Sequence, residues 1–203
     1  MKRTTLRPWF VLGAALLVGV LLAGVAVAQT ASTSFEMVRS ESAIDQGADC
    51  LQGAYANVDV RTVGGNQIMD VALRNAAPNT GFTLFVIQQP NAPFGVSWYQ
   101  GDLDTDNQGN GEVRVMGIFS EETHAFALAS VNAPQVDNQD AAKNPAFKPV
   151  HTLHLGMWFA DPREANAAGC SGTVTPFDGD HEAGIQALST RNFPDLGPLG
   201  RIR

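Results

Sequence analysis

Alternating apolar and polar side chains dominate the middle of the chain. Residues 57–62 and residues 69–74 place apolar or β-branched side chains at every second position, with mostly charged or amide side chains between them. A period of two is typical of a β-strand with one face in a core and the other in water. Gly64-Gly65-Asn66, which separates the two runs, suits a tight turn. The pattern predicts a β-hairpin and favours an all-β fold.

Further short apolar runs predict more strands and little helix. Residues 82–88 are apolar on both faces, so we expect them at a central position in a sheet. The other predicted strands span residues 112–119, 124–131, 151–159 and 183–189. One good helix start is present, with Asp161 at the cap, Pro162 at the first position and Glu164 soon after. This helix can be only two turns long before Gly169.

These elements together predict the fold class and the domain organisation. Six or seven short strands, frequent turn residues and scarce helix predict an antiparallel immunoglobulin-like β-sandwich with one short helix, over residues 49–190. A β-barrel is the alternative. The small polar residues 29–48 are expected to form a linker, and residues 191–203 an irregular tail. Residues 132–149 hold three prolines and no periodicity, and are expected to be a functional loop or disordered.

The first 28 residues have the features of an export signal. Lys2, Arg3 and Arg7 form a positive leader, and an uncharged, mostly apolar run extends from there to residue 28. The run ends on Ala26-Val27-Ala28, the small-x-small pattern that signal peptidases cleave. An uncleaved membrane anchor is the alternative, because about 20 apolar residues can span a bilayer. We therefore expect a helical signal peptide and a secreted or cell-surface protein.

Removal of this leader leaves a strongly acidic protein. The whole chain carries a formal charge of −7 and the leader contributes +3, so the remaining residues carry −10 at pH 7. Such a surface repels phosphate backbones and anionic membranes. We therefore expect no nucleic-acid partner and no membrane contact except through an uncleaved leader. A cell-surface protein or a glycan is the expected class of partner.

The two cysteines, Cys50 and Cys170, both follow the leader. In an oxidising compartment an even pair most simply forms one disulfide bond. The bond would close a loop of about 120 residues and stabilise the fold by roughly 4–5 kcal/mol on the chain-entropy model. Two thiolate ligands of a metal are the alternative, but zinc sites normally have a closely spaced partner cysteine.

An acidic, glycine-rich run suggests a calcium loop. Asp104, Asp106 and Gln108 stand at alternate positions and Gly109 follows, as in loops whose oxygens converge on calcium. The twelfth position, where such loops carry glutamate, is Val115. The alternative is a connection between strands, in which Asp, Asn and Gly serve turn geometry. Turn and calcium site both stay open at this point; no other cofactor is expected.

A transition-metal site is the second metal hypothesis. His181 lies in an acidic, turn-like run and could bind a divalent ion if His154 or His124 approached it. His151 and His154 would point to opposite faces of one strand, because their separation is odd. Hydrogen-bonded or exposed histidines without a metal are the alternative.

Aromatic residues give the main binding hypothesis. Trp98 and Tyr99 follow a Pro-rich turn and precede the acidic run. On a loop at one end of a sandwich they could form a platform for a sugar or a partner chain. The alternative is that Trp98 covers one end of the core. Trp158, with His154 on the same face of its strand, is expected in the core.

Catalytic motifs do not stand out. The chain has no Gly-x-Ser-x-Gly elbow, and the predicted disulfide would consume both thiols. A pair of catalytic carboxylates cannot be selected without a cleft. The sequence therefore leaves enzyme activity uncertain and favours a non-catalytic protein.

Three segments carry a resemblance to secreted bacterial proteins. The runs 79–84 and 104–111 resemble a pattern of secreted bacterial β-sandwich domains of the immunoglobulin-like kind, in which a Pro-Asn-Thr turn opens one strand and an Asp-x-x-Gly-x-Gly turn opens a later one. Residues 154–189 resemble the end of uncharacterised exported bacterial proteins. The resemblance implies a fold and a location, and it transfers no activity or site residue.

The leading hypothesis is therefore a secreted, non-catalytic β-sandwich that binds or builds at the cell surface through loops at one end. An extracellular domain that binds calcium or a transition metal is the second hypothesis. A secreted hydrolase with residues scattered over the loops is the third.

Overall fold

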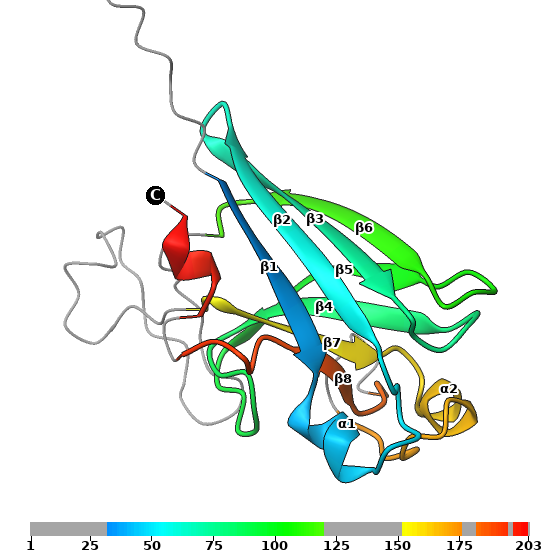
Figure 1. Cartoon of the computed structure of the whole chain (residues 1–203). Helices are drawn as coiled ribbons and strands as arrows, with labels where there is room; N and C mark the ends of the chain where they lie inside the picture. Colours follow the sequence, from blue (N-terminus) through cyan, green and yellow to red (C-terminus); the bar gives the residue numbers. More distant parts are fainter. Residues whose placement is uncertain (1–31, 120–151, 176–181, 195–196, 203) are drawn as a thin grey trace, which may run out of the picture.

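The computed structural model describes residues 32–119, 152–175, 182–194 and 197–202 (Figure 1). Its elements, in chain order, are β1 (Ser32–Arg39), α1 (Glu41–Asp45), β2 (Tyr55–Val63), β3 (Asn66–Arg74), β4 (Gly81–Ile87), β5 (Ser97–Asp104), β6 (Gly111–Gly117), β7 (His154–Phe159), α2 (Pro162–Ala167), β8 (Gln186–Ser189) and η2 (Leu199–Arg201). The predicted all-β class is confirmed.

The eight strands of the described ranges belong to one sheet, in the order β5-β4-β7-β8-β1-β2-β3-β6. Every pair of neighbours is antiparallel. The sheet curls until its two edge strands, β5 and β6, approach each other, so it forms a nearly closed barrel. The predicted immunoglobulin-like sandwich is not confirmed: there is one continuous sheet, and the barrel alternative describes it better.

The predicted hairpin forms as the alternation indicated. β2 pairs with β3 in an unbroken antiparallel register, with Val63 opposite Asn66 across the turn. Gly64 and Gly65 in this turn have φ values of 58° and 89°, which glycine adopts without strain. The apolar positions of both strands point into the barrel, where Val58, Val60 and their partners on β3 are buried.

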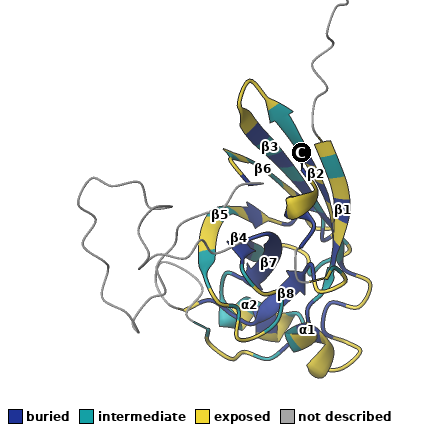
Figure 2. Cartoon of the chain, turned by 90° about the vertical axis from the view of Figure 1, so that its left-hand side faces the viewer, coloured by how far each residue is buried: buried dark blue, intermediate teal, exposed yellow. Residues whose placement is uncertain are grey.

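The core fills the inside of the barrel, and a smaller apolar cluster lies outside it. Phe82 and Leu84 of β4 belong to the main core, whereas Phe85 and Ile87 pack with Trp158 on the opposite face of the sheet. β4 lies between β5 and β7, so the central position predicted for residues 82–88 is confirmed. Figure 2 shows that β4 and β7 are mostly buried, whereas much of the edge strand β5 is exposed.

The first described segment corrects the expected linker. Residues 32–45 form β1 and α1, so the polar segment 29–48 holds a strand of the sheet and a second helix. Phe35 and Met37 are the buried side chains of β1, and the Ser and Glu residues around them face solvent. Ser40 caps α1, because its Oγ accepts a hydrogen bond from Ala43 N at 3.0 Å. With only two buried side chains, the alternation was too short to distinguish from a linker.

The C-terminal segment also differs from the expected irregular tail. Residues 199–201 form the short helix η2, and Leu199 and Ile202 are buried in the main core. Phe193 packs edge-on against Phe35 of β1, with ring centroids 5.8 Å apart. The prolines and glycines of this segment form turns, and these turns let the segment pack against the main core.

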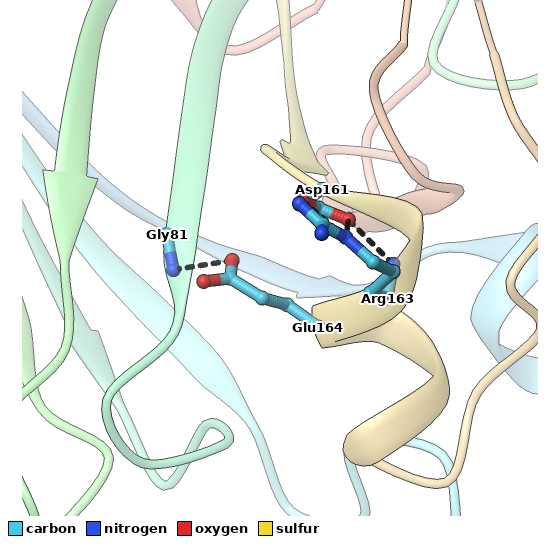
Figure 3. A network of polar contacts seen from close by, with 4 residues as sticks. All are labelled: Gly81, Asp161, Arg163 and Glu164. Atoms are coloured by element: carbon cyan, nitrogen blue, oxygen red, sulfur yellow. Dashed lines mark hydrogen bonds and ion pairs between the residues drawn. The ribbon is translucent and has the colours of Figure 1, made fainter.

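The disulfide and the predicted helix are both present. Cys50, just before β2, is bonded to Cys170, just after α2. Asp161 caps α2 by accepting from Arg163 N at 2.6 Å, and its carboxylate also pairs with the Arg163 guanidinium. Glu164 of the same helix accepts from Gly81 N at 2.9 Å, which fixes α2 to the start of β4 (Figure 3).

Several predictions lie outside the described residues. They are the leader 1–28, the strand 124–131, the Pro-rich segment 132–149, and residues His124, His151 and His181. Within the described ranges, no helix has both the length and the apolar character needed to cross a membrane.

Candidate functional site

The acidic run connects the two edge strands of the barrel. β5 and β6 are consecutive in the chain but pair with β4 and β3, so residues 105–110 form an arch across the seam between them. Asp106 Oδ1 accepts hydrogen bonds from Gln108 N at 2.8 Å and from Asn110 N at 2.9 Å. These backbone donors, Asn110 first, lower the pKa of Asp106 below its ordinary value, because they stabilise the carboxylate.

A second turn locks this arch in place. Thr105 is buried, and its Oγ1 accepts from Thr80 N at 2.9 Å and donates to the Ala77 carbonyl at 2.6 Å. The Ala76 N–H donates to the Gly109 carbonyl at 3.0 Å. The two runs that carry the resemblance to secreted bacterial domains are therefore in direct contact, and each stabilises the other.

Two acidic side chains of the arch and its surroundings, Asp106 and Glu112, have partners within the protein. One carboxylate oxygen of Asp106 already accepts hydrogen bonds from two backbone N–H groups, those of Gln108 and Asn110. The surface depression around Asp104 and Asp106 also contains Arg74, which pairs with Glu112 at 2.6 Å. In the described part of the chain, no three His, Cys, Asp or Glu side chains are grouped to hold a metal ion. The geometry favours the turn interpretation of Asp104, Asp106 and Gln108.

Of the histidines considered for a transition-metal site, His154 is the one that the structure describes. His154 is fully buried, and its Nδ1 lies 2.9 Å from Thr190 Oγ1. Trp158 of the same strand is also fully buried, in the smaller apolar cluster outside the barrel, so both residues are buried as predicted, but Trp158 does not belong to the main core. His181 lies outside the described residues, and a site that includes it stays a prediction.

The side chains of Trp98 and Tyr99 do not form a common platform. Both belong to β5, an edge strand, and not to a loop. Their partners on β4 are Val86 and Phe85, which face the inside and the outside of the barrel respectively. Successive side chains of a strand point to opposite faces, so the two aromatic rings are separated by the sheet.

Tyr99 has its contacts on the outer face. Its ring packs edge-on against Phe85 at a centroid distance of 6.0 Å, and its hydroxyl donates to Asp102 Oδ2 at 2.9 Å. The hydrogen bond to Asp102 raises the pKa of Tyr99, because loss of the phenolic proton would place two negative charges side by side. Tyr99 is thus half exposed but already engaged.

Trp98 lines a groove at the seam of the barrel whose other lining residues are both polar, such as Gln100 and Thr152, and apolar. The groove has a volume of about 210 Å³, and Val86 of the core also lines it. Its wall on the β6 side includes Met116 and Ile118. Trp98, Met116 and Ile118 are large apolar side chains that expose 54%, 68% and 52% of their surface. So much apolar surface around one cavity is unusual for a surface without a binding role.

The groove is wedge-shaped because the seam is closed at one end only. At Gly101 an added Cβ would lie 3.3 Å from Val115 Cγ1, and at Gly111 it would lie 2.6 Å from the Asp104 carbonyl oxygen. The strands are therefore in contact near the arch. Toward Trp98 and Ile118 they leave the groove between them.

Sequence reasoning missed the β6 wall of this groove. Met116 and Ile118 lie in the predicted strand 112–119, which was read only as a strand. The sequence does contain an indication of this wall. Met116 and Ile118 follow Glu112 and Arg114 at every second position, so all four side chains are expected on the solvent face of the strand. Two large apolar side chains on the solvent face of a strand indicate a surface to be covered.

Together these features define a class of protein. Over its described residues it is a predominantly antiparallel β protein with a nearly closed eight-stranded sheet, one disulfide bond and a groove at the open seam. Comparisons with protein-family models, with curated protein sequences and with solved structures gave no match.

The dependence of stability on pH tests whether the carboxylate of Asp106 stabilises the turn in the arch. The folded pKa of Asp106 is lowered, so the stabilisation is present above about pH 4 and is lost as pH falls through the folded value. Asp106→Asn keeps an acceptor oxygen without the charge, so we expect its stability to fall less than that of the wild type between pH 5 and pH 2. Urea unfolding at each pH measures this, with Asp45→Asn in α1 as the control.

The same variants test for calcium. We expect the melting temperature of the wild type to be equal with calcium and with a chelator. A rise with calcium that Asp106→Asn abolishes and Asp45→Asn keeps would establish the calcium hypothesis instead.

Proposed function

We propose that this chain is an exported, non-catalytic binding module, and that its binding surface is the groove between β5 and β6. The exposure of Trp98, Met116 and Ile118 around one cavity carries the proposal. Water around these side chains is displaced when an apolar ligand covers them, and this release favours binding.

Export is the second part of the proposal. The charged leader, the uncharged run and the Ala26-Val27-Ala28 cleavage pattern support it. The Cys50–Cys170 disulfide also supports it, because such bonds form and persist outside the reducing cytoplasm. The arch at residues 105–110 serves to hold the seam and does not itself bind the ligand.

Nile red, a neutral apolar dye, tests the groove without assuming a natural ligand. The test uses protein purified after expression of the full chain. We expect Trp98→Ala to weaken dye binding at least tenfold, which corresponds to about 1.4 kcal/mol. Tyr99→Ala is the matched control, because it removes an equally exposed aromatic ring from the other face of the same strand.

A less than twofold change is expected for Tyr99→Ala. Equal weakening by both substitutions would show a general effect on β5 and would contradict a binding site in the groove. Binding that neither substitution changes would place the dye elsewhere and would also contradict the proposal.

A further inference from the structure

The two strands beside the groove are the edges of the sheet. In the described residues, β6 pairs only with β3 and β5 pairs only with β4. An edge strand leaves alternate backbone N–H and C=O groups without a partner in the sheet. A chain in extended conformation can pair with these groups, whereas a sugar or a lipid tail cannot reproduce their spacing. The backbone next to the groove therefore favours a peptide.

The cavity is suited to one side chain of such a peptide. Its volume of about 210 Å³ is smaller than the roughly 300–1,000 Å³ of sites for drug-sized molecules. Trp98, Val86 and Ile118 line it, so the inserted side chain should be large and apolar. The neighbouring side chains of the peptide point away from the cavity, because strand side chains alternate.

Charge distinguishes a partner protein from a second copy of this chain. Without the leader the chain carries −10, so two copies repel each other. Beyond the groove, toward the arch, β5 exposes the carboxylates of Asp102 and Asp104, whereas Glu112 of β6 is already paired with Arg74. The cation on that stretch of β6, Arg114, is engaged by Asp70. The surface that continues the groove therefore favours basic side chains on the partner.

The distances allow one short peptide to meet both features. Asp102 stands four positions after Trp98 on β5; because of the bulge at Gln100 their partners on β4, Val86 and Thr83, are three positions apart, about 10 Å at the rise of a strand. A seven-residue extended peptide spans about 23 Å. It can place an apolar side chain in the groove and basic side chains near the carboxylates.

We infer that the groove binds an extended, apolar and basic segment of a partner protein, which adds to the sheet at the open edge of β6 and inserts one large apolar side chain beside Trp98. The inference rests on the proposed function and specifies the class of its ligand. Burial of the apolar wall supplies affinity, and backbone pairing supplies orientation.

Isothermal titration calorimetry with three synthetic peptides tests the inference. The first is acetyl-Lys-Val-Lys-Leu-Lys-Val-Lys-amide, which alternates apolar and basic side chains. The second has Glu in place of every Lys, and the third carries an N-methyl group on the central Leu, which removes one backbone donor. We expect the first peptide to bind at least tenfold more tightly than either of the others, and less tightly at high salt.

Two protein variants locate the peptide. Ile118→Ser should weaken binding of the lysine peptide at least fivefold, because it removes a wall of the groove. Val63→Ser is the matched control: Val63 is similarly exposed, at 49%, but lies at the β2–β3 turn. We expect a less than twofold change for this control.

Failure of the inference can be told from failure of the proposed function. Dye binding that depends on Trp98, with no binding of any peptide, would leave the proposed function standing and overturn the inference. Absence of both would overturn both. If the glutamate peptide bound as tightly as the lysine peptide, the basic character of the partner would be contradicted. If the N-methyl peptide bound as tightly, the addition of a strand to the sheet would be contradicted.

Two other occupants of the groove are also outcomes of the test. A dimer that Ile118→Ser dissociates in analytical ultracentrifugation would place a second copy there and overturn the inference. Residues 120–151 connect Phe119 and Thr152, which both line the groove. If acrylamide quenched tryptophan fluorescence equally in the wild type and in Trp98→Phe, Trp98 would be covered by the protein's own chain. That result would overturn the inference too.

Discussion

Replacement of both Cys50 and Cys170 by serine is expected to lower the free energy of unfolding by about 4–5 kcal/mol. The bond joins residues 120 positions apart in the sequence, so its loss releases most of the chain in the unfolded state. It also joins the loop before β2 to the end of α2, two segments that no strand pairing connects directly. Urea unfolding of the double variant and the wild type measures the difference.

Reduction of the wild type provides the control for this prediction. With a reducing agent, the wild type should unfold at nearly the same urea concentration as the double-serine variant. A loss below about 1 kcal/mol in both would contradict the account, because it would mean that packing alone holds the two segments together.

Gly109→Ala is expected to destabilise the protein by about 3 kcal/mol or more. Gly109 has a φ of 76°, and an added Cβ would lie 2.0 Å from the Ala76 carbonyl oxygen. That oxygen belongs to the backbone, so no side-chain rotation relieves the clash, and the arch must move away from the 75–80 turn. The hydrogen bond between Ala76 N and the Gly109 carbonyl is lost with it.

Gly65→Ala is the matched control for the arch. Gly65 also has a positive φ, 89°, but an added Cβ would meet nothing within 4 Å. Its substitution should cost only the conformational strain, about 1 kcal/mol. Thermal unfolding of both variants measures the difference; equal losses would mean that the arch does not pack against the 75–80 turn as described.

The parts of the fold that could be predicted are those with a long, simple pattern. The β2–β3 hairpin shows alternation over residues 57–62 and 69–74, on the two sides of a Gly-Gly turn, and a capped, Pro-started helix follows Asp161. The disulfide followed from there being only two cysteines after the leader. The hairpin and the helix depend on local chemistry that no distant contact overrides, and the disulfide depends only on the number of cysteines.

The closure of the sheet could not be predicted, because it depends on pairings between distant residues. β1 contacts both β2 and β8, and β7 contacts both β4 and β8. The same alternating strands can form two facing sheets or one curled sheet, since both arrangements bury one face of each strand. The alternation therefore defines the class but not the architecture.

The groove was half visible in the sequence. The sequence singles out Trp98 as a binding residue but predicts a loop there, after a Pro-rich turn, whereas Trp98 lies on β5, whose alternation is interrupted. The structure explains the interruption by a register shift at Leu84/Phe85, where Gln100 bulges from β5. The wall contributed by Met116 and Ile118 became evident only once the curled sheet brought β6 next to β5.

Amide hydrogen exchange along β6 tests the central claim most directly. The claim is that the outer edge of β6 is open in the protein alone and becomes paired when an extended partner binds. Successive N–H groups of an edge strand point alternately toward and away from the sheet. We predict that about half of the amides of residues 113–118 exchange quickly in the protein alone and become at least tenfold more protected with the lysine peptide. Strong protection of all these amides before the peptide is added, or no change after it, would contradict the account.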